Sequence, residues 1–125
     1  MILKNATIVN SDYIIEKGYL KIQDGKIVEI GTDYSGEGVD LEGKYILPGF
    51  IEMHIHGTNG VDVMDGTSEA LDIITTNLVK EGTTSFLPTT LTHSKAKIKQ
   101  AIRNIVSYQG NPGGAKIIGI HLEGP

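Results

Sequence analysis

The pattern of apolar and polar positions changes part-way along the chain. In the first part, an apolar-rich run covers residues 2–9, and alternating runs at residues 18–23 and 26–30 flank Asp24-Gly25. An Asp-Gly pair between such runs predicts a β-hairpin, because both turn residues must tolerate positive φ. We therefore expect residues 1–49 to be all-β.

From Phe50 onward, the pattern alternates between strands and helices. Strand-like apolar runs begin at Phe50, Thr83 and Lys116, and these starting points are 33 residues apart, since 83 − 50 and 116 − 83 both equal 33. Between them, residues 68–80 and 94–108 carry apolar side chains at helical spacing. Strands that alternate with helices predict a parallel sheet, so this part is of the α/β class.

The ends and faces of both helices can also be predicted. Thr67 or Ser68 can cap the amino end of the first helix, and Gly82 lies just past its carboxyl end. The apolar side chains of the second helix should fall on one face. Its apolar members are Ile98, Ala101, Ile102, Ile105 and Val106.

Two architectures accommodate such a sheet: an open doubly wound sheet or a closed barrel. No Gly-x-Gly-x-x-Gly follows any strand, which weakens a dinucleotide-binding interpretation. In a barrel, the chemistry lies at the carboxyl ends of the strands. His54 and His56 end the first run, and His121 and Glu123 end the third. This placement favours the barrel.

The candidate metal ligands are His54, His56 and Glu123. Residues two apart on a strand point to the same face, so the two histidines should point together. Two adjacent imidazoles make a poor apolar core but a good platform for Zn²⁺, Fe²⁺ or Mn²⁺. Glu123 could add a carboxylate oxygen. The competing interpretation is that backbone groups simply satisfy the two histidines.

Other polar residues receive structural interpretations. His121 is expected to hydrogen-bond or pack beside the site rather than to bind a metal directly. His93 should be a solvated loop residue, and Asp62 and Asp65 should serve turns and helix caps. Ser85 lies in an apolar run without a Gly-x-Ser-x-Gly motif, so the sequence does not support a serine triad.

Composition excludes several classes of function. Lys and Arg number 11 against 15 Asp and Glu, a net charge of −4, so the chain lacks the basic surface that nucleic acid or anionic membrane would attract. It has no cysteine, which excludes disulfides and thiolate metal sites. No apolar run approaches membrane length, and the first residues are too polar for a signal peptide. We expect a soluble, cytoplasmic protein.

These motifs resemble those of the amidohydrolase superfamily. Residues 47–57, Leu-Pro-Gly-Phe-Ile-Glu-Met-His-Ile-His-Gly, match its first barrel strand, which ends in His-x-His. Residues 82–89 and the final motif at 121–125, His-Leu-Glu-Gly-Pro, resemble the N-acetylglucosamine-6-phosphate deacetylases within it. The resemblance implies an N-terminal β-sandwich segment over residues 1–49, followed over residues 50–125 by the first three β/α units of a metal-dependent (β/α)₈ barrel.

The resemblance also implies an activity. Glu123, His54 and His56 match the family's metal ligands, for one or two divalent ions. The reaction would hydrolyse the acetamide of N-acetylglucosamine 6-phosphate to glucosamine 6-phosphate and acetate. The small-molecule partner is thus a phosphorylated amino sugar, and the full-length protein would form a homodimer. The family's catalytic aspartate, remaining ligands and phosphate-binding residues belong to positions beyond Pro125.

A complete barrel takes about 250 residues. We therefore expect residues 1–125 alone to be inactive, and their open strand edge to promote aggregation. Two other functions stay open. One is an amidohydrolase acting on a cyclic amide, although many of those carry a lysine where Glu123 stands. The other is a non-catalytic βα scaffold with structural histidines.

Overall fold

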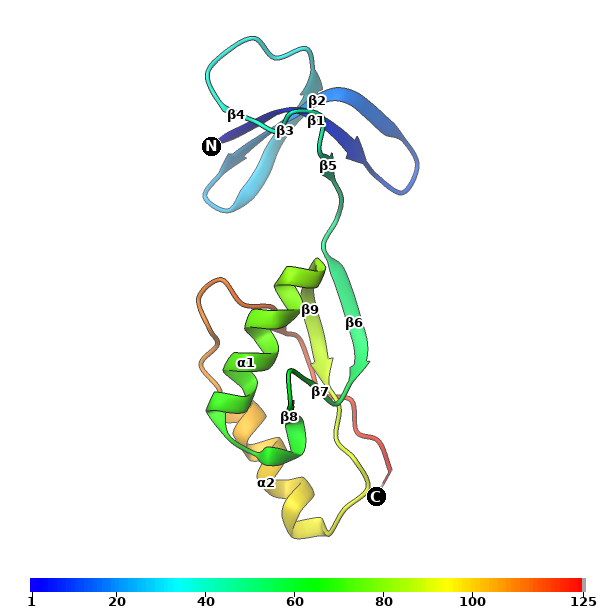
Figure 1. The fold of residues 1–125 in the computed structure, drawn as a ribbon, viewed down its shortest axis with the longest axis vertical. Coiled ribbons are helices and arrows are strands. Elements are labelled where there is room, and N and C mark those ends of the chain that lie inside the picture. The colour runs from blue at the N-terminus through cyan, green and yellow to red at the C-terminus, as the bar shows by residue number, and fades with distance from the viewer. Residues whose placement is uncertain (125) are drawn as a thin grey trace. The chain divides into compact units, whose positions relative to one another are not determined.

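The computed structural model describes residues 1–124, and the chain divides into two compact units, Met1–Pro48 and Gly49–Pro125. Figure 1 shows strands in the first unit and alternating strands and helices in the second. We refer to them as unit 1 and unit 2. The assignment of these units to a sandwich segment and a barrel segment stays a prediction.

Unit 1 is a sheet with strand order β3-β2-β1-β4, in which β5 also pairs with β1. The first three strands pair antiparallel, whereas β4 and β5 run parallel to β1. Within residues 1–48 the described strands form one sheet, so the all-β prediction for this part of the chain is confirmed. The strands are β1 (Ile2–Val9), β2 (Ile14–Gln23), β3 (Lys26–Thr32), β4 (Val39–Asp40) and β5 (Tyr45–Ile46).

The predicted hairpin joins β2 to β3. Asp24 and Gly25 have φ of 51° and 72°, the left-handed values that a two-residue turn of this kind requires. The hairpin prediction is therefore confirmed. The buried core of the unit is small and consists of Ala6, Ile8 and Leu20.

Unit 2 contains a parallel sheet with order β10-β9-β6. Its strands are β6 (Phe50–Ile55), β9 (Thr83–Pro88) and β10 (Lys116–Ile117), so all three start at the predicted residues. The expected run to residue 121 is regular only as far as Ile117. Beyond it, the His121 amide still donates to the Pro88 carbonyl at 3.1 Å, and His121 forms an isolated bridge with Thr89.

Two helices connect these strands and lie on one side of the sheet (Figure 1). Helix α1 spans Ser68–Leu78 and continues as the 3₁₀ turn η2 (Val79–Glu81), and α2 spans Lys95–Ser107. Thr67, not Ser68, caps α1, because its side chain accepts from the Ala70 amide. Among the described residues, no helix is both long and apolar enough to cross a membrane.

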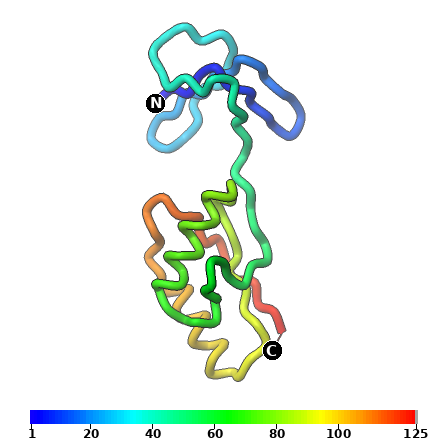
Figure 2. The backbone as a smooth tube through the Cα atoms, in the orientation of Figure 1, coloured from blue at the N-terminus to red at the C-terminus, as the bar shows by residue number. Residues whose placement is uncertain are grey.

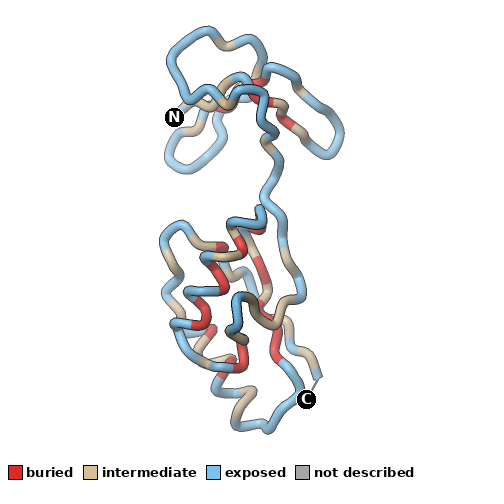
Figure 3. Tube along the Cα trace, in the orientation of Figure 1, coloured by how far each residue is buried: buried red, intermediate tan, exposed pale blue. Residues whose placement is uncertain are grey.

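The core of unit 2 lies between these helices and the sheet. Figure 3 shows buried positions gathered on α1 and β9. Val106, which the helical spacing groups with the apolar face of α2, is 74% exposed. Its position is about 100° round the helix from buried Ile105, at the edge of the apolar stripe. The buried cluster is Val63, Leu71, Ile74, Leu78, Phe86, Ile105 and Ala115.

A tight hairpin follows β6 and precedes α1, as the backbone trace in Figure 2 shows. Strands β7 (Gly57–Thr58) and β8 (Val61–Asp62) pair antiparallel around Asn59-Gly60. These two turn residues have φ of 54° and 80°. The 3₁₀ turn η1 (Val63–Asp65) then leads toward α1.

Candidate metal centre

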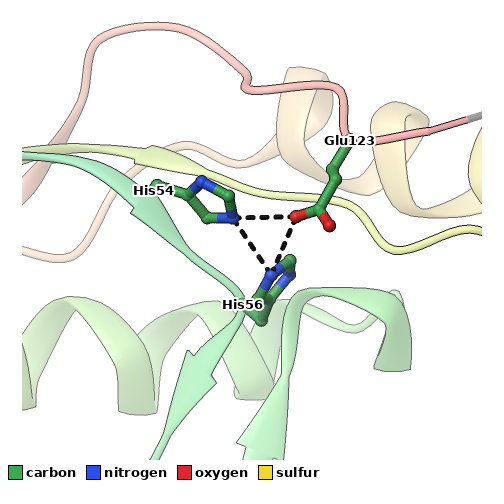
Figure 4. A group of neighbouring side chains, drawn as sticks. All are labelled: His54, His56 and Glu123. Carbon is green, nitrogen blue, oxygen red and sulfur yellow. Dashed lines mark hydrogen bonds and ion pairs between the residues drawn. The ribbon is translucent and has the colours of Figure 1, made fainter.

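The three predicted ligands meet at the carboxyl ends of the unit 2 strands. The Nε2 atom of His54 lies 2.8 Å from Oε2 of Glu123, and Nε2 of His56 lies 3.1 Å from the same oxygen. The two Nε2 atoms are 3.2 Å apart. Figure 4 shows the two rings and the carboxylate pointing toward one another. Residues 69 positions apart in sequence thus share one cluster.

Both the ring and the backbone of His56 are held by hydrogen bonds. Its Nδ1 lies 3.3 Å from the carbonyl oxygen of Thr89, which can only accept, so Nδ1 carries the proton. The Val63 amide donates to the His56 carbonyl at 2.7 Å. Gly57 is required next, because a Cβ there would clash with the Val61 carbonyl. The β7–β8 hairpin therefore fixes the backbone that carries His56.

His54 is oriented by its neighbours on β6 and by His121. Its amide donates to Oε1 of Glu52 at 2.9 Å. Its ring meets the His121 ring edge-on, with centroids 4.5 Å apart. Nδ1 of His121 in turn donates to the Met53 carbonyl oxygen at 2.9 Å. His121 lies beside the cluster as expected, as a packing and hydrogen-bonding partner.

Glu123 is placed by the loop that follows β9. Its amide donates to Oγ1 of Thr90 at 3.3 Å. Gly124 comes next with φ of 65°, and a Cβ at that position would clash with Oγ1 of Thr92. Glycine is therefore needed after the glutamate for two reasons, backbone conformation and space. The remaining motif residue, Pro125, lies outside the described residues.

The electrostatics of the cluster favour a cation. Nδ1 of His56 faces the Thr89 carbonyl oxygen, so Nε2 is the ring nitrogen that faces Glu123. Carboxylate oxygen and imidazole nitrogen are both acceptors, so they need a proton or a metal between them. Two ligand atoms bound to one ion, each at about 2.0–2.1 Å, lie no more than about 4.2 Å apart. The observed separations of 2.8–3.2 Å fit that limit.

The other polar candidates have the structural positions that the sequence predicted. Asp62 accepts from the Met64 amide, and Asp65 accepts from the Asp62 amide, so both form the capping box of η1. His93 is exposed beside Ser94, and its Nδ1 accepts from the Ser94 amide at 2.8 Å. Among the described residues, the cluster of His54, His56 and Glu123 is the one group of this kind with metal-ligand spacing.

Sequence reasoning missed two residues beside the site, Thr89 and Thr90. Both are fully buried, and they contact the segments that carry the ligands on either side of β9. A signal for them existed in the 33-residue period, since Thr89 lies 33 positions after His56. The period therefore indicates that these threonines lie at the end of the middle strand, beside the ligands. It does not predict their hydrogen bonds.

The sequence matches a known family over the whole of unit 2 and the four residues before it. The family model described as "Amidohydrolase family" covers residues 45–125. The chain belongs to the amidohydrolase family. Amidohydrolases are in general metal-dependent, and the clustered His54, His56 and Glu123 agree with that property.

Curated relatives add detail. The chain is 40% identical over 134 residues to N-acetylglucosamine-6-phosphate deacetylase of Bacillus subtilis (strain 168), covering 100% of this chain and 34% of that protein. It is 32% identical over 126 residues to N-acetylgalactosamine-6-phosphate deacetylase of Escherichia coli O157:H7, covering 99% of this chain and 33% of the relative. The chain thus spans about a third of the length of these relatives.

A solved structure shows the same fold. The N-acetylglucosamine-6-phosphate deacetylase of Thermotoga maritima superposes with a TM-score of 0.79 at 34% sequence identity. The match covers 100% of this chain and 32% of that one. The strand order and helix placement described above are therefore those of a portion of an amidohydrolase deacetylase fold.

Proposed function

We propose that this chain forms the part of an N-acetylglucosamine-6-phosphate deacetylase that carries a metal-binding His-x-His pair and a glutamate ligand. The observation that supports this most directly is the cluster of His54, His56 and Glu123, with its pairwise separations of 2.8–3.2 Å. The similarity to deacetylases over the whole chain supports the substrate class. The metal would be Zn²⁺, Fe²⁺ or Mn²⁺, as one ion or two, within a complete (β/α)₈ barrel and a homodimer.

Each of the three residues has a distinct task in this proposal. A divalent cation, when bound, lowers the pKa of a water molecule and polarises the acetamide carbonyl. His56 keeps its Nε2 lone pair available, because Nδ1 donates to the Thr89 carbonyl. His54 offers Nε2 from a ring held against His121. Glu123 supplies a carboxylate oxygen between the two imidazoles, so none of the three serves as the general base.

Metal binding by a full-length protein carrying this chain tests the site. We expect that protein to bind Co²⁺ or Zn²⁺ in isothermal titration calorimetry, and His56→Ala and Glu123→Ala to weaken or abolish that binding. His93→Ala is the matched control, because it removes an exposed imidazole outside the cluster and should leave the affinity unchanged. Equal binding by the His56→Ala variant and the parent would refute the proposed ligand set.

Acetate release tests the substrate. We expect a full-length protein carrying this chain to release acetate from N-acetylglucosamine 6-phosphate, and the 125-residue chain alone to be inactive. N-acetylgalactosamine 6-phosphate and a cyclic amide such as hydantoin serve as comparison substrates. Preference for the cyclic amide would favour the alternative amidohydrolase, and turnover by the 125-residue chain would refute the expected need for further strands.

A further inference from the structure

The middle strand of the unit 2 sheet supplies no metal ligand, yet it lies between the two segments that do. Strand β6 leads to the histidine pair on one side, and the segment after β10 leads to Glu123 on the other. The distance across the cluster therefore depends on how both flanking segments attach to the end of β9. Thr89 and Thr90, which directly follow β9, occupy that place, and both are 0% exposed.

Thr89 attaches to the histidine side through three groups. Its amide donates to the Ile55 carbonyl at 2.9 Å, and its Oγ1 accepts from the Ile55 amide at 2.9 Å. Its carbonyl oxygen accepts from Nδ1 of His56 at 3.3 Å. The hydroxyl hydrogen points to the Leu87 carbonyl at 3.1 Å, which leaves an Oγ1 lone pair for Ile55. Thr89 thus holds Ile55, which lies between the two histidines in sequence, and also holds the ring of His56.

Thr90 attaches to the glutamate side. Its amide donates to the His121 carbonyl at 3.1 Å, and its Oγ1 accepts from the Glu123 amide at 3.3 Å. Two consecutive threonines therefore direct one hydroxyl to each flanking segment. The threonine hydroxyl oxygen can accept an amide hydrogen from an adjacent strand. Valine has a similar shape but no oxygen, so it cannot accept this hydrogen bond.

We propose that Thr89 and Thr90 are positioning residues, which set the separation of the histidine pair from Glu123 by accepting the Ile55 and Glu123 amide hydrogens. This inference rests on the proposed metal site and extends it to the strand that carries no ligand. Groups that orient metal ligands change metal affinity by about 10- to 100-fold when they are lost. The hydroxyls act through the backbone of the ligand segments, so the effect belongs at the lower end of that range.

The test compares valine and serine variants in a full-length protein carrying this chain. We expect Thr89→Val to raise the Kd for Co²⁺ by about tenfold and to change the visible absorption spectrum of the bound ion. Thr90→Val should raise it by less, because 3.3 Å is long for an N–H···O bond. Thr89→Ser and Thr90→Ser keep the hydroxyl and should restore both the Kd and the spectrum. Thr83→Val is the control, since Thr83 is buried at the opposite end of β9.

A second measurement needs no metal. Amide hydrogen exchange by NMR in the apo chain should show faster exchange at Ile55 in Thr89→Val and at Glu123 in Thr90→Val, with the rest of unit 2 protected. Unchanged Co²⁺ affinity, spectrum and exchange in both valine variants would overturn the inference while leaving the metal site intact. A full-length parent protein that binds no Co²⁺ would overturn the metal site and this inference with it.

Discussion

The two units of this chain use similar local signals but bury very different amounts of apolar surface. Each contains a hairpin with two consecutive positive-φ residues, Asp24-Gly25 in unit 1 and Asn59-Gly60 in unit 2. Unit 1, however, buries three apolar residues, and its strand residues Ile27 and Val28 are 57% and 53% exposed. Unit 2 packs two helices on its sheet and encloses a cluster of seven buried apolar residues. Among the described residues, only the better packed unit brings distant side chains together at metal-ligand spacing.

The difference indicates what a metal site requires of its scaffold. Three side chains hold separations near 3 Å only if the backbone beneath them is fixed, and backbone is fixed by packing and hydrogen bonds. In unit 2, β9 is buried beneath α1 and both neighbouring strands pair with it. In unit 1, local turn chemistry sets the strand pairing with little packing to support it.

Removing the centre of the unit 2 core should have the largest effect. Phe86 is 0% exposed and belongs to the buried cluster that includes residues of both helices, so Phe86→Ala should cost about 3–5 kcal/mol of unfolding free energy and abolish Co²⁺ binding. Urea denaturation followed by NMR signals of each unit measures this. Ile73→Ala, at a 38% exposed position on α1, is the control and should cost much less. Similar losses from the two substitutions would contradict the packing argument.

The corresponding substitution in unit 1 should be milder and should leave the metal site alone. Leu20 is 4% exposed in a core of three residues, so Leu20→Ala should destabilise unit 1 by about 2 kcal/mol. All three ligands and the hydrogen-bond partners described for them belong to unit 2, so the Kd for Co²⁺ should not change. A higher Kd for Co²⁺ in this variant would show that unit 1 supports the site.

The glycine after Glu123 should affect the site more than the fold. Gly124→Ala combines an unfavourable positive φ with a clash against Thr92, so it should displace Glu123 and raise the Kd for Co²⁺ by about tenfold. Gly113 is a matched control, because its φ is 82° and a Cβ there meets nothing within 4 Å. Gly113→Ala should cost about 1 kcal/mol of stability at unchanged Kd. If Gly124→Ala and Gly113→Ala raised the Kd for Co²⁺ equally, the clash with Thr92 would not be the cause of the change.

The smallest expected effect concerns a tyrosine in unit 2. Tyr108 donates its hydroxyl hydrogen to Oδ1 of Asp72 at 2.6 Å, and burial, followed by this hydrogen bond, raises the pKa of Tyr108 above its ordinary value of 10.0. The bond stabilises the fold below pH 10 and is lost as the pH rises through the raised pKa. Tyr108→Phe should therefore lower the unfolding free energy by about 1 kcal/mol at pH 7 and remove the alkaline decline.

A tyrosine in unit 1 provides the comparison. The hydrogen bond from Tyr19 to Glu29 is the main cause that raises the pKa of Tyr19, but Tyr19 lies at the surface of the sheet. Tyr19→Phe should leave the alkaline decline of the unit 2 NMR signals unchanged. A decline that persists in Tyr108→Phe would trace the pH dependence of unit 2 to another group.

Local patterns predicted much of both units. The 33-residue spacing identified the first residue of all three unit 2 strands, and helical spacing located α1 and α2 to within two residues at each end, η2 included. The His-x-His pair and Glu123 were identified as ligand candidates because they come at the ends of the first and third apolar runs. The exposure of Val106 did not follow from the spacing, because a residue at the edge of an apolar stripe is buried only if a neighbouring element reaches it.

The sequence by itself determined the element types, their order and the residue types available for metal chemistry, because turn conformation and periodicity are local properties of the chain. Tertiary structure decided which distant residues became neighbours. The placement of β9 between β6 and β10, the attachment of both ligand segments to Thr89 and Thr90, and the approach of Glu123 to His54 all depend on contacts across more than 30 residues. Such contacts form only when the helices cover the sheet, since buried backbone groups must then find partners on neighbouring strands.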